Sequence, residues 1–420
     1  MKKYRWINSL KLRADYGLVG NDAGANYYAY MALYTSDQNA NKGAYYLSQN
    51  SNNDLKWETG SSLGIGLEGR FFNRWNLSLE YFDRRNRDLL FDVYMPLSAG
   101  ATSVTEAEST ITQNIGTIAN YGFELNTDVD IVKKKDWGLN FGFNATTLKN
   151  KITKLPEQNK DGIISDIYKI EEGKSRYEFY TYTYVGVDMM TGNSLYKANL
   201  EDYCYTETDG TIVGNASGTD ITSKVTKING EYYVNNTSYA LKEYQGSAIP
   251  KVYGSYSLTG RYKDFTLSAM MTYSIGGKVY DSIYQSLMST STSASNMHTD
   301  LLRSWSGVPE GMTETSVNRI SADAIPQINS TLSAYNNATS SRWLTDASYL
   351  VMKNISLGYK LPQTLVHRIG LDQVNLNVTC ENLFTLSARQ GLNPQQSFDG
   401  SQSNYLVTPR VFTFGINVKF

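Results

Sequence analysis

The stretch LKLRADYGL, residues 10–18, alternates between apolar and polar side chains. Side chains of a β-strand point alternately to its two faces, so this stretch predicts a strand with one apolar and one charged face. Its length is that of a strand that crosses a bilayer at a tilt. The apolar positions are Leu10, Leu12, Ala14, Tyr16 and Leu18, and the positions between them are Lys11, Arg13, Asp15 and Gly17.

The same alternation recurs along the chain and predicts about ten crossings in all. The further segments are residues 63–67, 75–81, 121–131, 137–143, 252–262, 265–275, 351–361, 374–384 and 412–420. Short turns, such as 72–74 and 133–135, separate some of them, and long connections separate others. We therefore predict an all-β fold, a transmembrane antiparallel β-barrel with short turns in the periplasm and long loops outside. The long loops are residues 19–60, 150–251, 276–342 and 386–408.

The ends of these segments indicate how they are placed in the membrane. Aromatic residues crowd there, where interfacial girdles are expected. They are Trp75, Trp137, Phe265, Tyr273, Tyr349 and Tyr359. If the first strand runs outward, an even number of crossings brings Phe420 to the periplasmic edge. A terminal aromatic residue resembles the signal that the outer-membrane assembly machinery reads, so we expect removal of Phe420 to impair assembly more than ligand binding.

Composition favours strands and excludes several other classes of protein. The 420 residues include 33 Tyr and 33 Gly against 8 Pro, a mixture typical of strands and turns. The formal net charge of −1 argues against a nucleic-acid partner, which needs a basic surface. No run of about 18 apolar residues occurs, which excludes a transmembrane helix. A soluble β-sandwich is the plain alternative, but its strands usually have only about five or six residues.

Candidate catalytic groups have simpler structural interpretations. The segment 64–69, GIGLEG, matches a dinucleotide-binding pattern, but it lies inside an alternating segment rather than at a strand-to-helix turn. Four carboxylates occupy lumen-facing positions, where charge is expected because water fills the interior. They are Glu80, Glu124, Asp128 and Asp130.

Metal ligands and nucleophiles are scarce. Only two histidines are present, His298 and His367, and no cysteine is near either in the sequence. The sequence therefore has too few candidate ligands for a zinc site and too few candidate bases for a catalytic triad. We predict no metal, no cofactor and no enzymatic activity. Cys380 shares its parity with Val374 and Val378, so we expect it to face lipid as a small apolar residue.

The long loops are rich in tyrosine, asparagine, serine and threonine. Aromatic rings and amides together suit the recognition of carbohydrate or peptide. The alternative is that these side chains pack the loops against one another. The candidate ligand-binding residues are Tyr27, Tyr28, Tyr30, Tyr180, Tyr182, Tyr184, Tyr232 and Tyr233.

Several strings resemble the SusC/RagA family of TonB-dependent outer-membrane transporters. They are LKWETG (55–60), NIG (114–116), NYGFEL (120–125), GVD (186–188) with TG (191–192), ASYL (347–350), KNISLGY (353–359) and ENLF (381–384), in the order of the family. The family positions we single out are Trp57, Glu58, Asn120, Gly122, Glu124, Gly186, Asp188, Tyr349, Asn354, Glu381, Asn382 and Phe420.

The resemblance implies that residues 1–420 form the C-terminal portion of a barrel of about twenty-two strands. The family's plug domain, signal peptide and TonB-contacting segment have no counterpart here, so we expect the plug domain to be absent and the sequence to be a truncated part of a longer protein. The resemblance further implies an outer-membrane location in a Gram-negative bacterium and uptake of glycans or peptides. The implied partners are a SusD-like surface lipoprotein, the TonB complex through the missing N-terminal region, and the lipid and assembly machinery of the outer membrane.

Two other classes of function are kept open. One is a self-contained outer-membrane barrel enzyme of the protease or lipase type, which requires converging acid, base or nucleophilic groups at the barrel mouth. The other is a soluble, all-β surface binding module. Partition into detergent with heat-modifiable gel mobility distinguishes the soluble module from either barrel.

Overall fold

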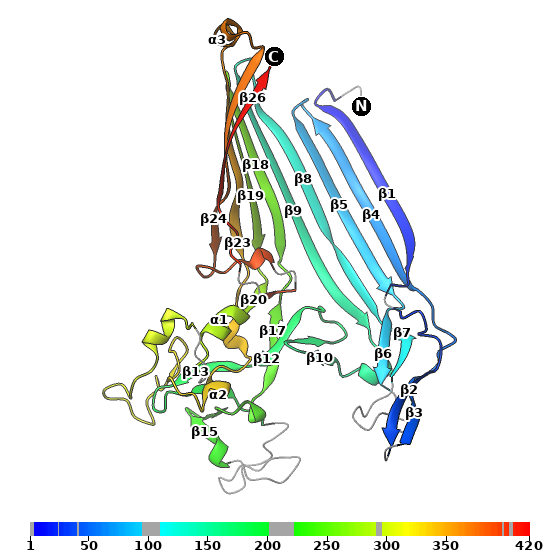
Figure 1. The fold of residues 1–420 in the computed structure, drawn as a ribbon, viewed down its shortest axis with the longest axis vertical. Coiled ribbons are helices and arrows are strands. Elements are labelled where there is room, and N and C mark those ends of the chain that lie inside the picture. The colour runs from blue at the N-terminus through cyan, green and yellow to red at the C-terminus, as the bar shows by residue number, and fades with distance from the viewer. Residues whose placement is uncertain are drawn as a thin grey trace.

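The computed structural model describes residues 4–23, 25–39, 42–94, 110–200, 222–290, 296–396, 399–402 and 406–420. Its main feature is a curved sheet of ten strands, each antiparallel to its neighbours (Figure 1). Their order in the sheet is their order in the chain, and it confirms the predicted all-β antiparallel fold and its ten crossings. The strands are β1 (Ile7–Asn21), β4 (Glu58–Phe71), β5 (Trp75–Arg87), β8 (Thr117–Lys133), β9 (Trp137–Lys154), β18 (Val252–Tyr262), β19 (Phe265–Ile275), β23 (Tyr349–Lys360), β24 (Gln373–Ser387) and β26 (Val411–Lys419).

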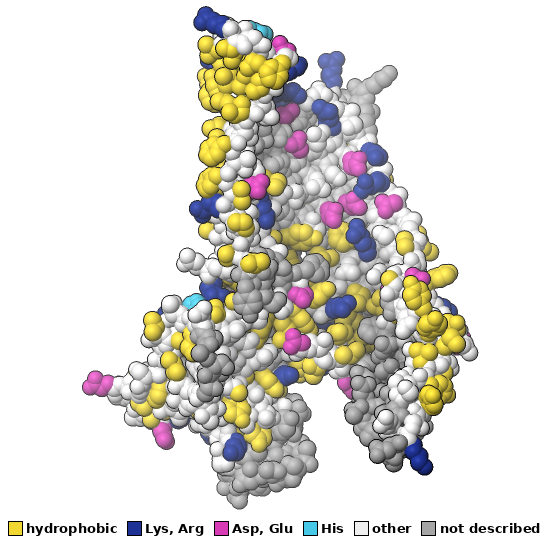
Figure 2. Space-filling model, viewed as in Figure 1, with side chains coloured by type: hydrophobic (Ala, Val, Ile, Leu, Met, Phe, Trp, Pro, Cys, Tyr) yellow, Lys and Arg dark blue, Asp and Glu magenta, His cyan; other side chains and the backbone are white. Residues whose placement is uncertain are grey.

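The two faces of this sheet differ in polarity, as the alternation requires. On the outer face apolar residues lie opposite one another, as in the pair Leu12 and Leu67, and Leu12 is 75% exposed. On the inner face the Arg13 guanidinium contacts the Glu80 carboxylate and lies 3.4 Å from that of Glu68. Acidic and basic side chains gather over β1, β4 and β5 in Figure 2. An exposed apolar face of this size fits contact with lipid, and the charged face fits contact with water.

Tight turns join three of the four strand pairs that are connected at one end of the sheet, and a longer link joins β23 to β24. Between β4 and β5, Phe72 and Asn73 have φ angles of 53° and 55°. Positive φ at both central residues defines the turn type that matches the twist of a hairpin, and asparagine tolerates it well. Aromatic rings line the same end: the ring centroids of Trp6 and Phe71 are 5.8 Å apart, and those of Phe265 and Tyr359 are 4.4 Å apart. The predicted girdle is thus present at the turn end.

The long connections lie at the other end and form two separate groups of small sheets (Figure 1). The first group, here called the first lobe, joins the connection between β1 and β4 to the connection between β5 and β8. The sequence prediction did not include the second of these among the long loops, and residues 95–109 within it lie outside the described residues. The strands of the first lobe are β2 (Leu33–Asn39), β3 (Lys42–Gln49), β6 (Leu90–Tyr94) and β7 (Thr110–Asn114).

The second lobe joins three connections that are far apart in the sequence. Its three sheets contain β10 (Ile163–Ser165), β11 (Tyr168–Ile170), β12 (Glu178–Tyr182) and β17 (Lys242–Ser247); β13 (Tyr184–Asp188), β14 (Ser194–Lys197), β15 (Val225–Ile228), β16 (Glu231–Val234) and β21 (Ile320–Ser321); and β20 (Lys278–Asp281), β22 (Leu344–Asp346) and β25 (Ser401–Gln402). Its core is apolar and includes Phe179, Tyr280 and Trp343. Two of the connections therefore supply residues to a shared core, and the third contributes β25, which pairs with β20.

Helices are short. They are α1 (Ser282–Leu287), α2 (Ser333–Asn336) and α3 (Gln363–Val366), and α3 lies in the link between β23 and β24. Single 3-10 turns occupy Glu157–Asn159, Thr222–Lys224, Thr237–Tyr239, Thr299–Arg303, Ser341–Trp343, His367–Ile369 and Pro394–Gln396. Across the described ranges, no helix has both the length and the apolar character needed to span a membrane.

Two sequence predictions can be compared with local structure. The glycines of segment 64–69 lie within β4, and Gly69 serves packing there, since a Cβ on it would come within 2.6 Å of the Phe71 ring. The expectation for Cys380 was wrong in part. Cys380 lies on the apolar side of β24 but is only 6% exposed, because it sits between Ile355 and Phe412 on the neighbouring strands.

Candidate ligand-binding site

A pocket of about 660 Å³ lies on the inner face of the sheet, at the end that carries the loops. We call it the luminal pocket. Inward-facing residues of β5, β8 and β9 form its wall, and residues of the second lobe cover it at the loop end of the barrel. Its lining includes Glu58, Phe82, Arg84, Asn86, Asn120, Glu124, Asn150, Lys154, Arg176, Tyr177 and Tyr253.

The side-chain amide of Asn150 connects the barrel wall of the luminal pocket to residues 175–176 of the second lobe. The Asn150 Nδ2 donates a hydrogen bond to the Asn120 Oδ1 at 2.7 Å, which joins β9 to β8. The Asn150 Oδ1 accepts from the Ser175 hydroxyl at 3.2 Å and from the Arg176 amide at 2.8 Å. Because one side chain makes all three bonds, the position of residues 175–176 is tied to the barrel wall.

Charges of both signs face this pocket. Arg84, Lys154 and Arg176 are basic, and Glu58 and Glu124 are acidic. The Glu58 carboxylate is fixed, because it accepts hydrogen bonds from the Leu90 amide at 3.0 Å and the Asn21 side chain at 3.0 Å.

Arg84 lies over an aromatic ring, since its guanidinium carbon is 5.4 Å from the centre of the Phe82 ring. Guanidinium, carboxylate, amide and aromatic groups together suit a polar oligomer with charged or hydroxyl groups. Within the described part of the chain, no three His, Cys, Asp or Glu residues gather as a metal site would require.

The candidate tyrosines fall into two sets. In the first lobe Tyr27, Tyr28 and Tyr30 are exposed, Tyr27 by 95%. These three rings are available to a ligand or a partner.

The tyrosines of the second lobe mostly pack against one another. The rings of Tyr182 and Tyr184 lie 6.5 Å and 5.9 Å from the ring of Tyr196, which is fully buried, and burial raises the pKa of the Tyr184 hydroxyl. Tyr180 lies 5.2 Å from Tyr244.

Residues 232 and 233 are also part of this lobe. The Tyr232 hydroxyl accepts a hydrogen bond from the Lys227 ammonium at 2.9 Å, and Tyr232 and Tyr233 are half-buried on β16. The alternative weighed for these loops, that they pack on each other, therefore describes the second lobe better than the first.

A buried ion pair joins the two longest loops. The Asp188 carboxylate accepts two hydrogen bonds from the Arg319 guanidinium, at 2.8 Å and 2.9 Å, and their side chains are 3% and 9% exposed. Burial alone would raise the pKa of Asp188, but the hydrogen bonds from Arg319, the Met190 amide and Thr191 hold that pKa below its ordinary value. Gly186 lies beside this pair with φ of 150°, and a Cβ there would be 2.6 Å from the Ser321 carbonyl oxygen.

The remaining family positions lie on the sheet or at its ends. The Trp57 ring covers Gly20, and Asn354 faces Glu381 across an irregular step in the pairing of β23 with β24. Asn382, with φ of 51°, donates to the Pro409 carbonyl at 3.2 Å. Gly122 packs against Thr147, Tyr349 begins β23, and Phe420 directly follows β26.

The structure brings Glu58, Asn120 and Glu124 into the luminal pocket, but it places the other family positions elsewhere. Sequence reasoning missed Arg84, Arg176 and Tyr253 as members of the pocket. Arg84 could have been found, since it continues the inward series of β5 after Glu80 and Phe82. Arg176 could not, because only the folding of the second lobe brings it to the wall.

Known proteins resemble the chain along its full length. TonB-dependent receptor P3 of Formosa agariphila is 28% identical, over 100% of this chain and 40% of that protein. TonB-dependent receptor SusC of Bacteroides thetaiotaomicron is 25% identical, over 100% of this chain and 38% of that protein. The structure of the RagAB peptide transporter superposes with a TM-score of 0.70 at 23% identity, over 99% of this chain and 41% of that one. The chain thus spans about two fifths of the length of these relatives.

A family model described as TonB dependent receptor-like, beta-barrel, matches residues 3–383. The match confirms the predicted resemblance to SusC/RagA receptors, the barrel fold and the location in the outer membrane of a Gram-negative bacterium. It also agrees with the prediction that the chain is not an enzyme, since the family consists of receptors. From the ten-strand sheet, its lipid-facing side and this match over most of its length, the chain belongs to the TonB-dependent receptor-like β-barrel family.

Proposed function

We propose that the intact protein imports a polar oligomer, a glycan or a peptide, across the outer membrane, with energy from the TonB complex. The luminal pocket is the observation that carries this proposal, because it lies inside the barrel wall beneath the loops, on the route of a solute. Its amides and its charges of both signs can bind hydroxyl groups or the backbone and termini of a peptide. The names of two relatives, SusC and the RagAB peptide transporter, point to the same type of receptor.

Substitution of inward charges should weaken uptake. In the variant Arg84→Gln/Glu124→Gln, loss of charged hydrogen bonds to the solute should reduce its affinity about tenfold or more. The measurement is uptake of labelled oligopeptides and oligosaccharides by cells that carry the full-length protein. Arg85→Gln is the matched control, since Arg85 follows Arg84 directly but lies on the outer face, where it pairs with Asp83 at 2.8 Å.

The two solute classes are tested side by side, so that the class whose uptake falls identifies the substrate. Heat-modifiable mobility confirms that each variant is folded in the membrane. Equal uptake of every solute by the double variant and by wild type would contradict the assignment of the pocket.

We infer further that a SusD-like lipoprotein covers the loop end and contacts the first lobe. The exposed rings of Tyr27, Tyr28 and Tyr30 support this, since exposed aromatic residues are enriched at protein interfaces. The variant Tyr27→Ser/Tyr28→Ser/Tyr30→Ser should lose most of the lipoprotein that co-purifies with the intact protein. The control is Tyr232→Ser, in the other lobe; retention of the lipoprotein by the triple variant counts against the contact.

A further inference from the structure

A basic pocket lies near the loop end of the sheet. Outward residues of β8 and β9 contribute to its lining, and it adjoins the luminal pocket, with which it shares Leu148 and Asn150. Its volume is about 710 Å³, and we call it the rim pocket. Four lysines line it: Lys149 and Lys151 from the outward face of β9, Lys174 from the second lobe, and Lys251 just before β18. Its lining also includes the apolar residues Phe123, Ile249 and Pro250.

The lysines of the rim pocket lack close carboxylate partners in the described ranges, although Glu171 and Glu178 attract Lys174 and Asp346 attracts Lys251 over longer distances. Among the described residues, none of its four lysines forms an ion pair with a carboxylate, whereas Lys169 and Lys197 in the same lobe pair with Glu171 and Glu243 at 2.9 Å and 3.0 Å. The Lys174 ammonium lies 4.6 Å from the centre of the Tyr244 ring, which leaves its charge in place.

One carboxylate, Glu178, lines the rim pocket. Burial raises its pKa above the ordinary value, against the attraction of Lys174 and Lys278. Glu178 is the only acidic residue among the described residues that line the rim pocket, and its raised pKa favours the uncharged form.

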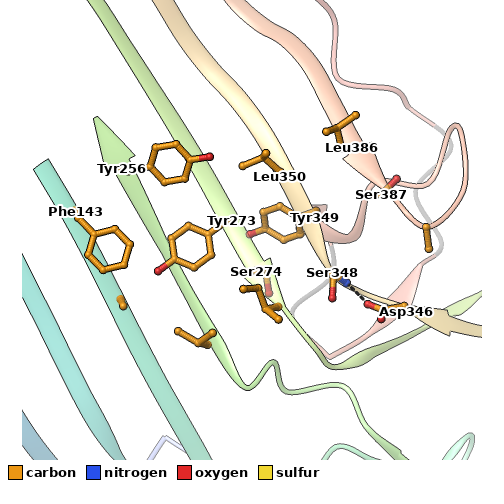
Figure 3. Close-up of a pocket in the computed structure, with 14 residues that line it drawn as sticks. Phe143, Tyr256, Tyr273, Ser274, Asp346, Ser348, Tyr349, Leu350, Leu386 and Ser387 are labelled. Carbon is orange, nitrogen blue, oxygen red and sulfur yellow. Dashed lines mark hydrogen bonds between the residues drawn. The ribbon is translucent and has the colours of Figure 1, made fainter. Parts of the chain in front are cut away.

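An apolar groove continues the rim pocket toward the membrane. Figure 3 shows the rings and aliphatic side chains that line it, among them Phe143, Tyr256, Tyr273, Leu350 and Leu386. The groove has a volume of about 910 Å³, and we call it the aromatic groove. The Asp346 carboxylate at its edge accepts a hydrogen bond from the Ser348 amide at 2.6 Å.

The two features are continuous along two strands. On β9 the outward positions Phe143 and Ala145 belong to the aromatic groove, and the next outward positions, Thr147 and Lys149, belong to the rim pocket. At the start of β18, Lys251 lines the rim pocket and Val252 lines the groove. One ligand can therefore contact both.

The position of these features relative to the bilayer follows from the geometry of β9. From Trp137 to Thr147 the strand advances about 33 Å, which at a tilt of about 40° raises it about 25 Å, the height of the apolar band of an outer-membrane barrel. The outward series is apolar up to Ala145 and basic from Lys149. The lysines thus lie at the level of lipid headgroups, and the groove lies at the level of acyl chains.

We propose that the rim pocket and the aromatic groove together bind a phosphorylated lipid of the external leaflet, with its phosphate among Lys149, Lys151, Lys174 and Lys251 and an acyl chain in the groove. Charge complementarity selects this occupant, since the lining is basic at headgroup level and apolar below it. A protein partner or a second copy of the chain would not require a basic region at headgroup level directly above an apolar region. Binding at this site is independent of solute transport through the lumen.

Interfacial lysines can also extend toward headgroups in general without a specific site. The same hairpin offers a control for this, because Lys134 and Lys135 lie in the turn between β8 and β9 at the opposite membrane surface. The test compares Lys149→Gln/Lys151→Gln with Lys134→Gln/Lys135→Gln in the intact protein, purified from outer membranes and placed in lipid nanodiscs. The probe is diphosphorylated lipid A, with dephosphorylated lipid A and inorganic phosphate as the other arms.

Wild type should bind diphosphorylated lipid A in preference to the other two probes. Each lysine near the membrane surface contributes roughly a fivefold factor in affinity, so the Lys149/Lys151 variant should bind about 25-fold more weakly. Ala145→Trp should fill the groove and also weaken binding of the lipid, without change in heat-modifiable mobility. Equal binding by the Lys149/Lys151 variant and wild type, equal losses in both lysine variants, or no preference for the phosphorylated lipid would each overturn the proposal.

Discussion

Replacement of Arg319 by methionine is expected to destabilise the second lobe by about 3–5 kcal/mol, because it leaves the Asp188 carboxylate buried without its partner. The remaining hydrogen bonds to Asp188, from the Met190 amide at 3.0 Å and the Thr191 hydroxyl at 3.1 Å, compensate only part of the lost pair. Limited proteolysis of the loops should become much faster, while the heat-modifiable mobility of the barrel stays as in wild type. Unchanged proteolysis would show that the pair does not hold the loops together.

Two further variants isolate the buried charge as the cause. Asp188→Asn/Arg319→Met removes both charges and should be less destabilised than Arg319→Met alone. Lys197→Met removes a partner of an exposed pair, with Glu243, and should change stability by no more than about 1 kcal/mol.

The pH dependence of the lobe has a defined sign. The folded-state pKa of Asp188 is lowered, so the stabilisation from its charge is present above the unfolded value of about 3.9 and is lost as the pH falls through the folded pKa. In Arg319→Met, burial without the cation raises that pKa instead. Acidification from neutral pH should therefore stabilise the lobe of this variant, as measured by the rate of proteolysis with an acid-tolerant protease.

Replacement of Gly122 by alanine should prevent most of the protein from reaching its folded form in the membrane. A Cβ at this position would lie 1.8 Å from the Thr147 carbonyl oxygen, a backbone atom that can move only if β8 and β9 separate. Overpacking of this kind has a cost at or beyond the upper end of about 1–3 kcal/mol. The measurement is the fraction of protein in outer membranes that shows heat-modifiable mobility.

Gly17→Ala is the matched control for Gly122→Ala. Gly17 also lies at an inward position of a sheet strand, β1, but a Cβ there would meet no atom within 4 Å. This variant should assemble like wild type. If both variants assemble normally, the close approach at Gly122 has no structural consequence.

The ten strands could be predicted because lipid on one side and water on the other impose a period of two on the side chains. The turn at Phe72 and Asn73 was readable for a similar local reason. The two lobes were not readable, since their sheets pair segments from different connections, as in β13 with β21. Nothing local marks Asp188 as the partner of a residue that lies 131 positions further along the chain.

Part of the candidate site could also be predicted. Glu124 is inward by parity, and the structure places it in the luminal pocket. Tyr182 and Tyr184 were chosen for their composition, but composition does not distinguish rings that face a ligand from rings that pack on Tyr196. The rim pocket had a local signal that went unused, the change from apolar to basic along the outward series of β9 that ends in Lys149 and Lys151.

The pairing of distant segments in the second lobe has a consequence for the folding pathway. The Tyr168 hydroxyl donates to the Asp399 carbonyl at 2.7 Å, across 231 positions of sequence, and β20 pairs in parallel with β25. Contacts of such high sequence separation form slowly, because a long stretch of chain must first be ordered. The second lobe should therefore fold late, after the hairpins of the sheet. Its folding should require that the chain up to residue 402 is already in place.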